Sequence, residues 1–337
     1  MRVVSFILRR LILLIPILLG ISIVTFAMTH VLPGDPLYIL LSPYAKEEDV
    51  QKRRVELGLD QPLYKQYIIY LEDLLQGDLG TAYRTRQPVT EDLKSRFPVT
   101  FELTTFSLAL ASLVGIPIGV QAAVRKDTWL DHVTRALSVG GVSIPIFWTG
   151  IVLIYILYFK LQIAPPPLGR LDPFMDAPRH ITGMYTFDAL VTGNGEALRS
   201  ALEHIALPAV TLAFAMLAPI MRITRSSMLE AMSSRYVQTA LALGLPLRKV
   251  VYKDALRNAL LPVVTSIGLI YGWSLGGEVL VEVVFSWPGL GYYAVNSIIN
   301  MDFNPVQGFV LVTAVIYVLV NLIVDVLYTV IDPRIRI

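Results

Sequence analysis

The sequence predicts an all-α integral membrane protein with six spans and both termini in the cytoplasm. Of its 337 residues, 55% are apolar and only 16% are charged, whereas soluble domains carry about 25% charged residues. The mean hydropathy is +0.61. Apolar stretches with at most one charged residue recur along the chain, most of them close to the length of about 20 residues that crosses a bilayer as a helix.

The residue content excludes several classes of function. The chain has no cysteine, which rules out disulfides, thiol nucleophiles and thiolate zinc sites. Its four histidines (His30, His132, His180 and His204) lack the spacing of a metal-binding motif. A net charge of +2 is too small for a nucleic-acid-binding protein.

Six stretches are apolar enough to span a membrane. The first follows Arg9 and Arg10, but it is longer than the apolar region of a signal peptide and no small-residue cleavage site follows it. The acidic residues within the stretches are Glu102, Glu278 and Asp325, and each lies near an end. We expect spans at 11–31, 100–124, 139–159, 205–221, 259–280 and 309–331.

The positions of Lys and Arg predict the orientation of these spans. With the N-terminus inside, the inner connecting segments carry Lys and Arg at more than twice the density of the outer ones. Cytoplasmic loops of membrane proteins show this enrichment. Both termini are therefore expected in the cytoplasm.

The outer segment 33–100 is expected to be partly helical. Residues 46–56 form one charged helix, and a turn at 58–62 precedes a second, amphipathic helix that ends at Gly77. The segment either caps the outer ends of the spans or docks an extracytoplasmic partner. The apolar residues of the second helix recur at helical spacing: Tyr67, Tyr70, Leu71, Leu74 and Leu75.

Two more outer segments differ in character. Residues 161–204 contain three consecutive prolines and many Gly, Pro and Asp residues, so we expect an irregular loop on the surface. Residues 284–305 carry Phe285 and Trp287 near a Pro-Gly-Leu-Gly turn and have no Lys or Arg. We expect that aromatic loop at the level of the lipid headgroups, or folded back toward a pore.

The inner loop 222–257 carries the clearest local pattern. Ser233 and Ser234 can cap a short helix, Gly244 can end it with a left-handed residue, and Pro246 suits the first turn of the next helix. Such a basic amphipathic helix either lies on anionic lipid or inserts into a cytoplasmic partner. One face holds Tyr236, Val237, Ala240, Leu241 and Gly244, of which Ala240 and Gly244 are small enough to let another surface approach closely; the surrounding basic residues are Arg222, Arg225, Arg235, Arg248, Lys249, Lys253 and Arg257.

Residues 236–245 and 255–262 closely resemble the cytoplasmic signature loop of ABC-importer permeases. More narrowly, they resemble the first permease subunit of the dipeptide, oligopeptide and nickel importers. The resemblance extends along the whole chain through motifs in the same order: Arg9-Arg10-Leu11, Leu32-Pro33-Gly34-Asp35-Pro36, residues 57–62, Gly77-Asp78-Leu79-Gly80, residues 285–291, residues 321–325 and Asp332-Pro333-Arg334.

The sequence departs from the general importer pattern in three places. Gln238 and Thr239 stand where the general loop has Glu and Ala, and Arg257 stands where it has Pro. These first two departures resemble the pattern that is usual for this subunit type. Glu278 stands where a small or neutral residue is expected, which leaves the local substrate chemistry open.

The resemblance implies a type I ABC-importer transmembrane fold in the inner membrane and a transport subunit rather than an enzyme. Its partners would be a second homologous permease, two cytoplasmic ABC ATPases and an extracytoplasmic solute-binding protein. The chain itself would bind no cofactor, with ATP and Mg on the ATPases, and it contains no P-loop motif. The implied units are 1–96, a transmembrane domain 97–331 with the coupling loop 222–257, and a cytoplasmic tail 332–337.

On this resemblance the segment 235–244 is the coupling helix, seated in a groove of the ATPase. The residues expected to carry the coupling are Tyr236, Val237, Gln238, Thr239, Ala240, Leu241, Gly244 and Arg248.

Four polar residues near the membrane are candidates for a pathway or gate. Glu278 and Glu282 share a helix face and either line the outer mouth or sit solvated among headgroups. Asn321 and Asp325 are more typical of hydrogen bonds between helices or of helix capping. Arg222 and Arg225 are expected to mark the inner boundary of the membrane.

Two other classes of function compete with an ABC permease. A transporter driven by an ion gradient would need ion sites near the midplane, commonly with inverted repeats, and no span has a central charged residue. A membrane-embedded hydrolase would need a nucleophile and a base converging within the spans, where the only imidazole is that of His30, at a helix end.

Overall fold

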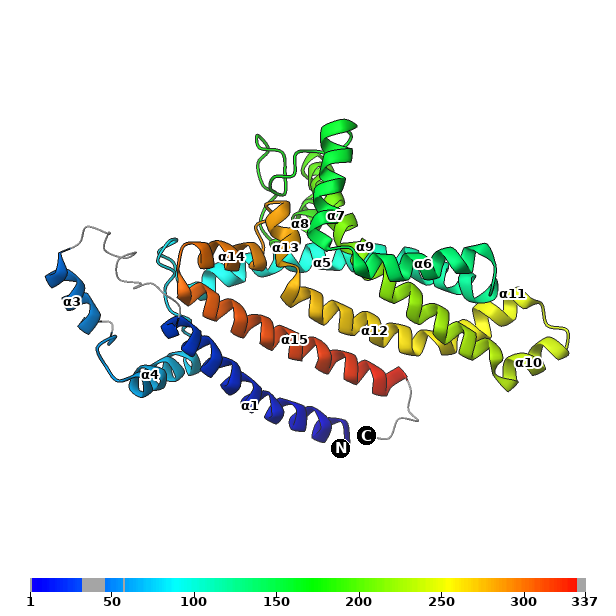
Figure 1. The fold of residues 1–337 in the computed structure, drawn as a ribbon, viewed down its shortest axis with the longest axis horizontal. Helices are drawn as coiled ribbons and strands as arrows, with labels where there is room; N and C mark the ends of the chain where they lie inside the picture. The colour runs from blue at the N-terminus through cyan, green and yellow to red at the C-terminus, as the bar shows by residue number, and fades with distance from the viewer. Residues whose placement is uncertain (1, 32–45, 57, 332–337) are drawn as a thin grey trace.

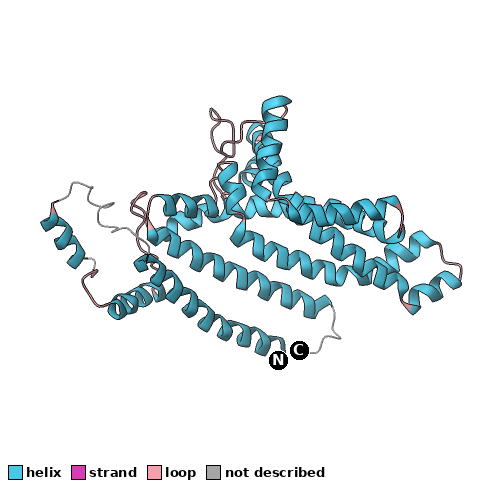
Figure 2. Ribbon diagram, viewed as in Figure 1, coloured by secondary structure: helices cyan, strands magenta, loops and turns pink. Residues whose placement is uncertain are grey.

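A computed structural model describes residues 2–31, 46–56 and 58–331 of the chain. The regular elements within these ranges are all helices (Figures 1 and 2). The motifs 32–36 and 332–334 and the tail 332–337 lie outside the described residues. The elements are α1 (Arg2–Val31), α3 (Glu47–Glu56), α4 (Leu63–Leu75), α5 (Val89–Val124), α6 (Trp129–Ser143), α7 (Ile146–Leu153), the π-helix η1 (Ile154–Lys160), α8 (Tyr185–Thr192), α9 (Gly195–Ser233), α10 (Arg235–Ala242), α11 (Leu247–Lys249), the π-helix η2 (Val250–Ala255), α12 (Leu256–Gly277), α13 (Val279–Val284), α14 (Leu290–Ile299) and α15 (Phe303–Ile331).

Four helices among the described residues are long and apolar enough to cross a membrane. They are α5, α9, α15 and the helix that runs through α11, η2 and most of α12. The pair α6 and α7–η1 passes the same test together but bends by 105° at its junction. Pro145 precedes α7 and Ile144 is extended, because the residue before a proline avoids the helical region.

The helix that contains the predicted span 205–221 is much longer than that span. It is α9, which covers 39 residues and passes through Pro208 and Pro219. Membrane helices tolerate internal proline because neighbouring helices and side chains satisfy the freed backbone groups. The charged flanks of the predicted span therefore continue as helix rather than as loop.

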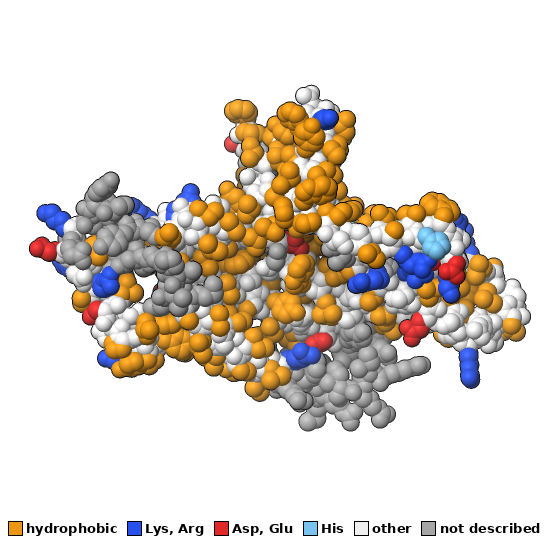
Figure 3. Space-filling model, in the orientation of Figure 1, with side chains coloured by type: hydrophobic (Ala, Val, Ile, Leu, Met, Phe, Trp, Pro, Cys, Tyr) orange, Lys and Arg blue, Asp and Glu red, His pale blue; other side chains and the backbone are white. Residues whose placement is uncertain are grey.

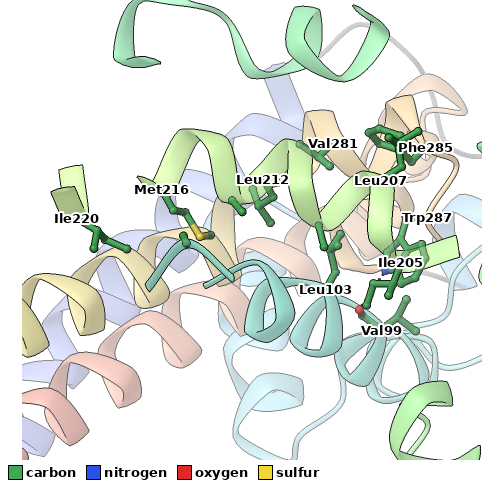
Figure 4. Packing of buried hydrophobic residues seen from close by; sticks show 13 residues of the cluster. Val99, Leu103, Ile205, Leu207, Leu212, Met216, Ile220, Val281, Phe285 and Trp287 are labelled. Atoms are coloured by element: carbon green, nitrogen blue, oxygen red, sulfur yellow. Dashed lines mark hydrogen bonds between the residues drawn. The ribbon is translucent and has the colours of Figure 1, made fainter. Parts of the chain in front are cut away.

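The core of the molecule lies between α5 and α9, whose side chains interdigitate (Figure 4). Leu103, Leu212 and Ile220 are at most 1% exposed. The two helices approach closely at Gly119, where an added Cβ would lie 2.7 Å from the Thr224 Cβ. Only glycine fits this contact without a shift of the neighbouring helix.

Residues 161–184 form an irregular, mostly exposed loop, as expected, whereas the rest of the segment 161–204 is largely helical in α8 and the start of α9. A buried ion pair anchors this loop to α5. Arg170 donates from Nη2 to Glu102 Oε2 of α5 at 2.6 Å and to the Gly183 carbonyl at 2.9 Å. Glu102 also accepts from the Thr186 backbone N–H and hydroxyl. Charged groups are buried only when they are paired in this way. The ion pair between Arg170 and Glu102 therefore fixes the position of the loop against α5.

Asp188, near the start of α8, organises the end of the same loop. Its carboxylate accepts from the backbone N–H groups of Ile181, Thr182 and Gly183 and from the Thr182 hydroxyl. Burial raises the pKa of Asp188, but these donors outweigh burial and hold the pKa below its ordinary value. The charged form of Asp188 therefore stabilises this turn.

The aromatic loop between α13 and α14 packs its large side chains into the core, and its position relative to the headgroups stays a prediction. Phe285 is 2% exposed and Trp287 1% exposed, and both join the core cluster with Leu103 and Ile205 (Figure 4). The Trp287 Nε1 donates to the Val99 carbonyl of α5 at 3.1 Å. A buried indole needs such an acceptor, and α5 supplies it.

Replacing Trp287 with alanine is expected to destabilise the fold by about 3–5 kcal/mol, because the change opens a large cavity in the core. The midpoint of thermal unfolding in detergent would measure the loss. Trp273 of α12 is 66% exposed and provides a matched control, since Trp273→Ala removes no core contact. Equal shifts for the two variants would contradict the buried role of Trp287.

The first helix lies at the edge of the molecule and is covered in part by α4 (Figure 1). The Tyr67 hydroxyl of α4 is hydrogen-bonded to the Ser22 hydroxyl of α1 at 2.9 Å. Phe26 of α1 packs against the rings of Tyr67 and Tyr70. The predicted helices after the first span thus form at α3 and α4, and α4 turns its tyrosines toward α1.

Candidate functional site

The short helix α10 has ends that its local sequence determines. Gly244 adopts φ +79°, and its N–H donates to the Leu241 carbonyl, which closes the helix with the predicted left-handed residue. Ser234 is the N-cap residue, but its hydroxyl donates back to Ala231 of α9 instead of capping α10. Pro246 is the residue before α11 rather than part of its first turn, because its ψ of 132° is extended.

Val237 fixes the orientation of α10. Its side chain is 0% exposed and lies in an apolar cluster with Val120 of α5, Met228 of α9 and Val250 of η2. The residues on either side, Tyr236 and Gln238, are exposed. Val237 therefore anchors the helix to the ends of three long helices and turns the rest of α10 outward.

The exposed α10 surface contains most of the predicted coupling residues. Ala240 is half-buried against the chain's own apolar cluster, so its small size serves internal packing. An added Cβ on Gly244 would meet nothing within 4 Å. Figure 1 shows α10 and α11 at one extreme of the molecule, without cover from the chain. The exposed members are Tyr236, Gln238, Thr239, Leu241, Gly244 and Arg248.

An ion pair braces the helices that lead to this surface. Arg225 of α9, expected at the membrane boundary, donates from Nη2 to Asp131 of α6 at 2.8 Å and also binds it through Nε. Asp131 is 0% exposed. Sequence reasoning missed this pair because the two residues are 94 positions apart. The basic segment 125–135 holds two carboxylates, Asp127 and Asp131, and nothing local indicates which of them pairs with Arg225.

Glu282 is buried where α13, α14 and α5 meet, and it does not face solvent in this chain. It is 1% exposed and accepts from the Thr100 hydroxyl at 2.6 Å and the Tyr292 N–H at 2.9 Å. A Cβ on Gly289 would collide with its carboxylate. The Pro-Gly-Leu-Gly turn therefore wraps Glu282, which joins α13, α14 and α5.

The other gate candidates occupy different places. Glu278 is 7% exposed at the break between α12 and α13, so it is not solvated among headgroups. Asp325 forms an interhelical ion pair with Arg10 of α1 at 2.8 Å. Asn321 is half-buried on α15, and within the described residues its Oδ1 accepts no hydrogen bond. The structure does not bring these residues together into one site.

Comparison with known proteins decides the family. Residues 115–337 match the family described as "Binding-protein-dependent transport system inner membrane component", and residues 3–104 match its N-terminal region. The chain belongs to this family. It is thus an inner-membrane permease subunit and not an enzyme, which confirms the resemblance seen in the sequence and disfavours an ion-gradient transporter.

Curated relatives of this permease match it along nearly its full length. It is 48% identical to the probable D,D-dipeptide transport system permease protein DdpB of Escherichia coli (strain K12), over 96% of this chain and 94% of the relative. It is 43% identical to the dipeptide transport system permease protein DppB of the same strain, over 98% of each chain. The glutathione transport system permease protein GsiC of Salmonella choleraesuis (strain SC-B67) is 39% identical, over 98% of this chain and 99% of the relative.

Proposed function

We propose that this permease forms half of the translocation pathway of an ATP-driven importer for peptides. The second half is a homologous permease, two cytoplasmic ABC ATPases supply the energy, and an extracytoplasmic binding protein delivers the cargo. The names of the relatives support short peptides or peptide-like solutes. The observation that carries the ATP coupling is the geometry of α10, a short uncovered helix held by one buried side chain.

The contacts of α10 suit it to transmit movement. Its N-terminus follows α9 directly, and Val237 packs on η2, which continues into α12. The hydroxyl of Tyr236 also accepts from the Asn258 side chain of α12 at 2.9 Å. A push on the exposed α10 surface would therefore reach α9 and α12 together. Cargo would move when those spans shift relative to the second permease.

The proposal includes the topology expected from the sequence. The chain would cross the membrane six times with both termini in the cytoplasm, so that α10 faces the ATPases and the loop after η1 faces outward. ATP and Mg would be held by the ATPases, and this chain would bind no cofactor. The segment 33–100 would either dock the binding protein or cap the spans.

Co-purification in mild detergent tests the proposal, with the wild type compared with Gly244→Arg. We expect the wild type to retain an ATPase and a second permease, and Gly244→Arg to lose the ATPase selectively. Gly193→Arg is a matched control, because Gly193 ends α8 at φ +70° and an added Cβ there also meets nothing within 4 Å. Both variants carry the same cost of placing a side chain in the left-handed region, about 1–2 kcal/mol.

Mass spectrometry and ATPase assays of the eluates distinguish the outcomes. Loss of the ATPase with both variants would point to general destabilisation and contradict the role of α10. Recovery of the chain alone from wild-type membranes would overturn the ATP-driven assembly. Uptake of a labelled dipeptide by reconstituted complexes would then test the cargo.

A further inference from the structure

An apolar groove of about 430 Å³ lies between α1, α4 and α15. Its walls are aliphatic and include Ile15 and Leu19 of α1, Leu74 and Leu75 of α4, and Val315 of α15. The groove lies away from α10 and from the buried carboxylate of Glu282, so the coupling mechanism does not use it.

The polar groups at the groove are satisfied within the chain. Ser22, the one hydroxyl-bearing residue among the described lining residues, donates to the Leu19 carbonyl at 2.8 Å and is hydrogen-bonded to Tyr67 at 2.9 Å. Among the residues that the structure describes, no charged side chain lines the cavity. A buried polar ligand would lack partners there, so the groove suits a purely apolar occupant.

The groove opens onto an exposed apolar surface of the chain. Leu75 is 88% exposed at its rim, Ile15 58% and Leu19 43%. The exposed apolar face of α1 continues beyond the groove through Ile12 and Ile23. Apolar side chains dominate the view of the molecule in Figure 3, and most charged groups gather toward its ends. In an inner-membrane protein a continuous apolar surface of this kind meets acyl chains.

The helix α4 places the groove near one edge of the bilayer. Tyr67 and Leu74 face the groove side, while the exposed residues away from the groove include the charged Lys65, Glu72 and Asp73 together with the apolar Ile68 and Ile69. Charged side chains need water or headgroups while apolar ones suit the acyl region, so a helix that exposes both kinds suits the membrane interface. The groove beneath α4 therefore begins just below the headgroups of that leaflet.

We propose that this groove binds one acyl chain of a phospholipid from the leaflet on the side of α4. The chain enters along α1, lies between α1 and α15, and is covered by α4. The bound lipid fills the space between the two peripheral helices, which contact each other directly elsewhere and carry the Arg10–Asp325 ion pair.

Photolabelling of the assembled transporter in lipid nanodiscs tests the proposal. The probe is phosphatidylethanolamine with a diazirine in one acyl chain, and mass spectrometry locates the labelled peptides. We expect labels concentrated in residues 71–79 and 311–316. Val315→Trp fills the groove and should lower this labelling several-fold. Leu319→Trp is the control, because Leu319 lies one turn along α15, is 42% exposed and does not line the groove.

The alternative occupants give different results. Even labelling along the exposed face of α1, unchanged by Val315→Trp, would show bulk lipid only and overturn the proposal. A segment of the second permease would also overturn it. Because the chain has no cysteine, Leu75→Cys offers a unique thiol, and its cross-linking to the other permease in place of lipid would reveal that occupant.

Discussion

Val237→Asp is expected to abolish ATP-driven uptake while the chain still inserts into the membrane. The Val237 side chain is 0% exposed in the apolar cluster beneath α10. An unpaired carboxylate buried there costs several kcal/mol. Displacement of α10 from the cluster would expose the carboxylate to water and remove this cost. The spans are held by other contacts, chiefly between α5 and α9. The measurements are dipeptide uptake by proteoliposomes, ATPase stimulation and the amount of chain in the membrane.

The design of this experiment separates positioning from direct contact. Val237 does not reach the surface, so a partner cannot touch it and any loss must act through the placement of α10. Val237→Ala keeps the site apolar and should retain partial uptake. Val191→Asp on α8, where the valine is 56% exposed, should be neutral. Normal uptake by Val237→Asp would show that the packing of Val237 beneath α10 is not needed for coupling.

Arg170→Ala is expected to cost about 3–5 kcal/mol, because removing one partner of a buried ion pair leaves the other uncompensated. Glu102 is 3% exposed and would keep only its contacts with Thr186. The Arg170 guanidinium also lies 3.6 Å from the centre of the Tyr185 ring, and this stacking would be lost as well. We expect faster proteolysis within residues 161–184 and a lower unfolding temperature in detergent.

A double variant provides the control for this effect. Glu102→Gln with Arg170→Met removes both charges and keeps apolar bulk beside Tyr185, so it should be less destabilised than Arg170→Ala. Arg199→Ala breaks an ion pair in which the Arg199 side chain is 82% exposed and should change little. If Arg170→Ala unfolds at the wild-type temperature, the pair does not anchor the loop.

The class of protein and the approximate positions of the main helices follow from the sequence alone. Apolar stretches of membrane-spanning length mark the spans, because a bilayer demands a continuous helix of apolar residues. Local chemistry also determined the end of α10, since only glycine adopts the left-handed conformation of Gly244 without strain. The turn before α4 and the end of α4 near Gly77 follow from the same local rules.

The direction in which individual side chains face depends instead on how the helices pack against each other. Val237 and Tyr236 are neighbours on an amphipathic helix, and the packing of α5, α9 and η2 sends one inward and the other outward. The sequence predicted Glu282 at the outer mouth of a pathway or among lipid headgroups. In the structure its carboxylate is buried and accepts a hydrogen bond from Thr100, which is 182 positions away. Hydropathy patterns report the average environment of a segment, whereas the partner of a buried charge depends on which distant helix packs against it.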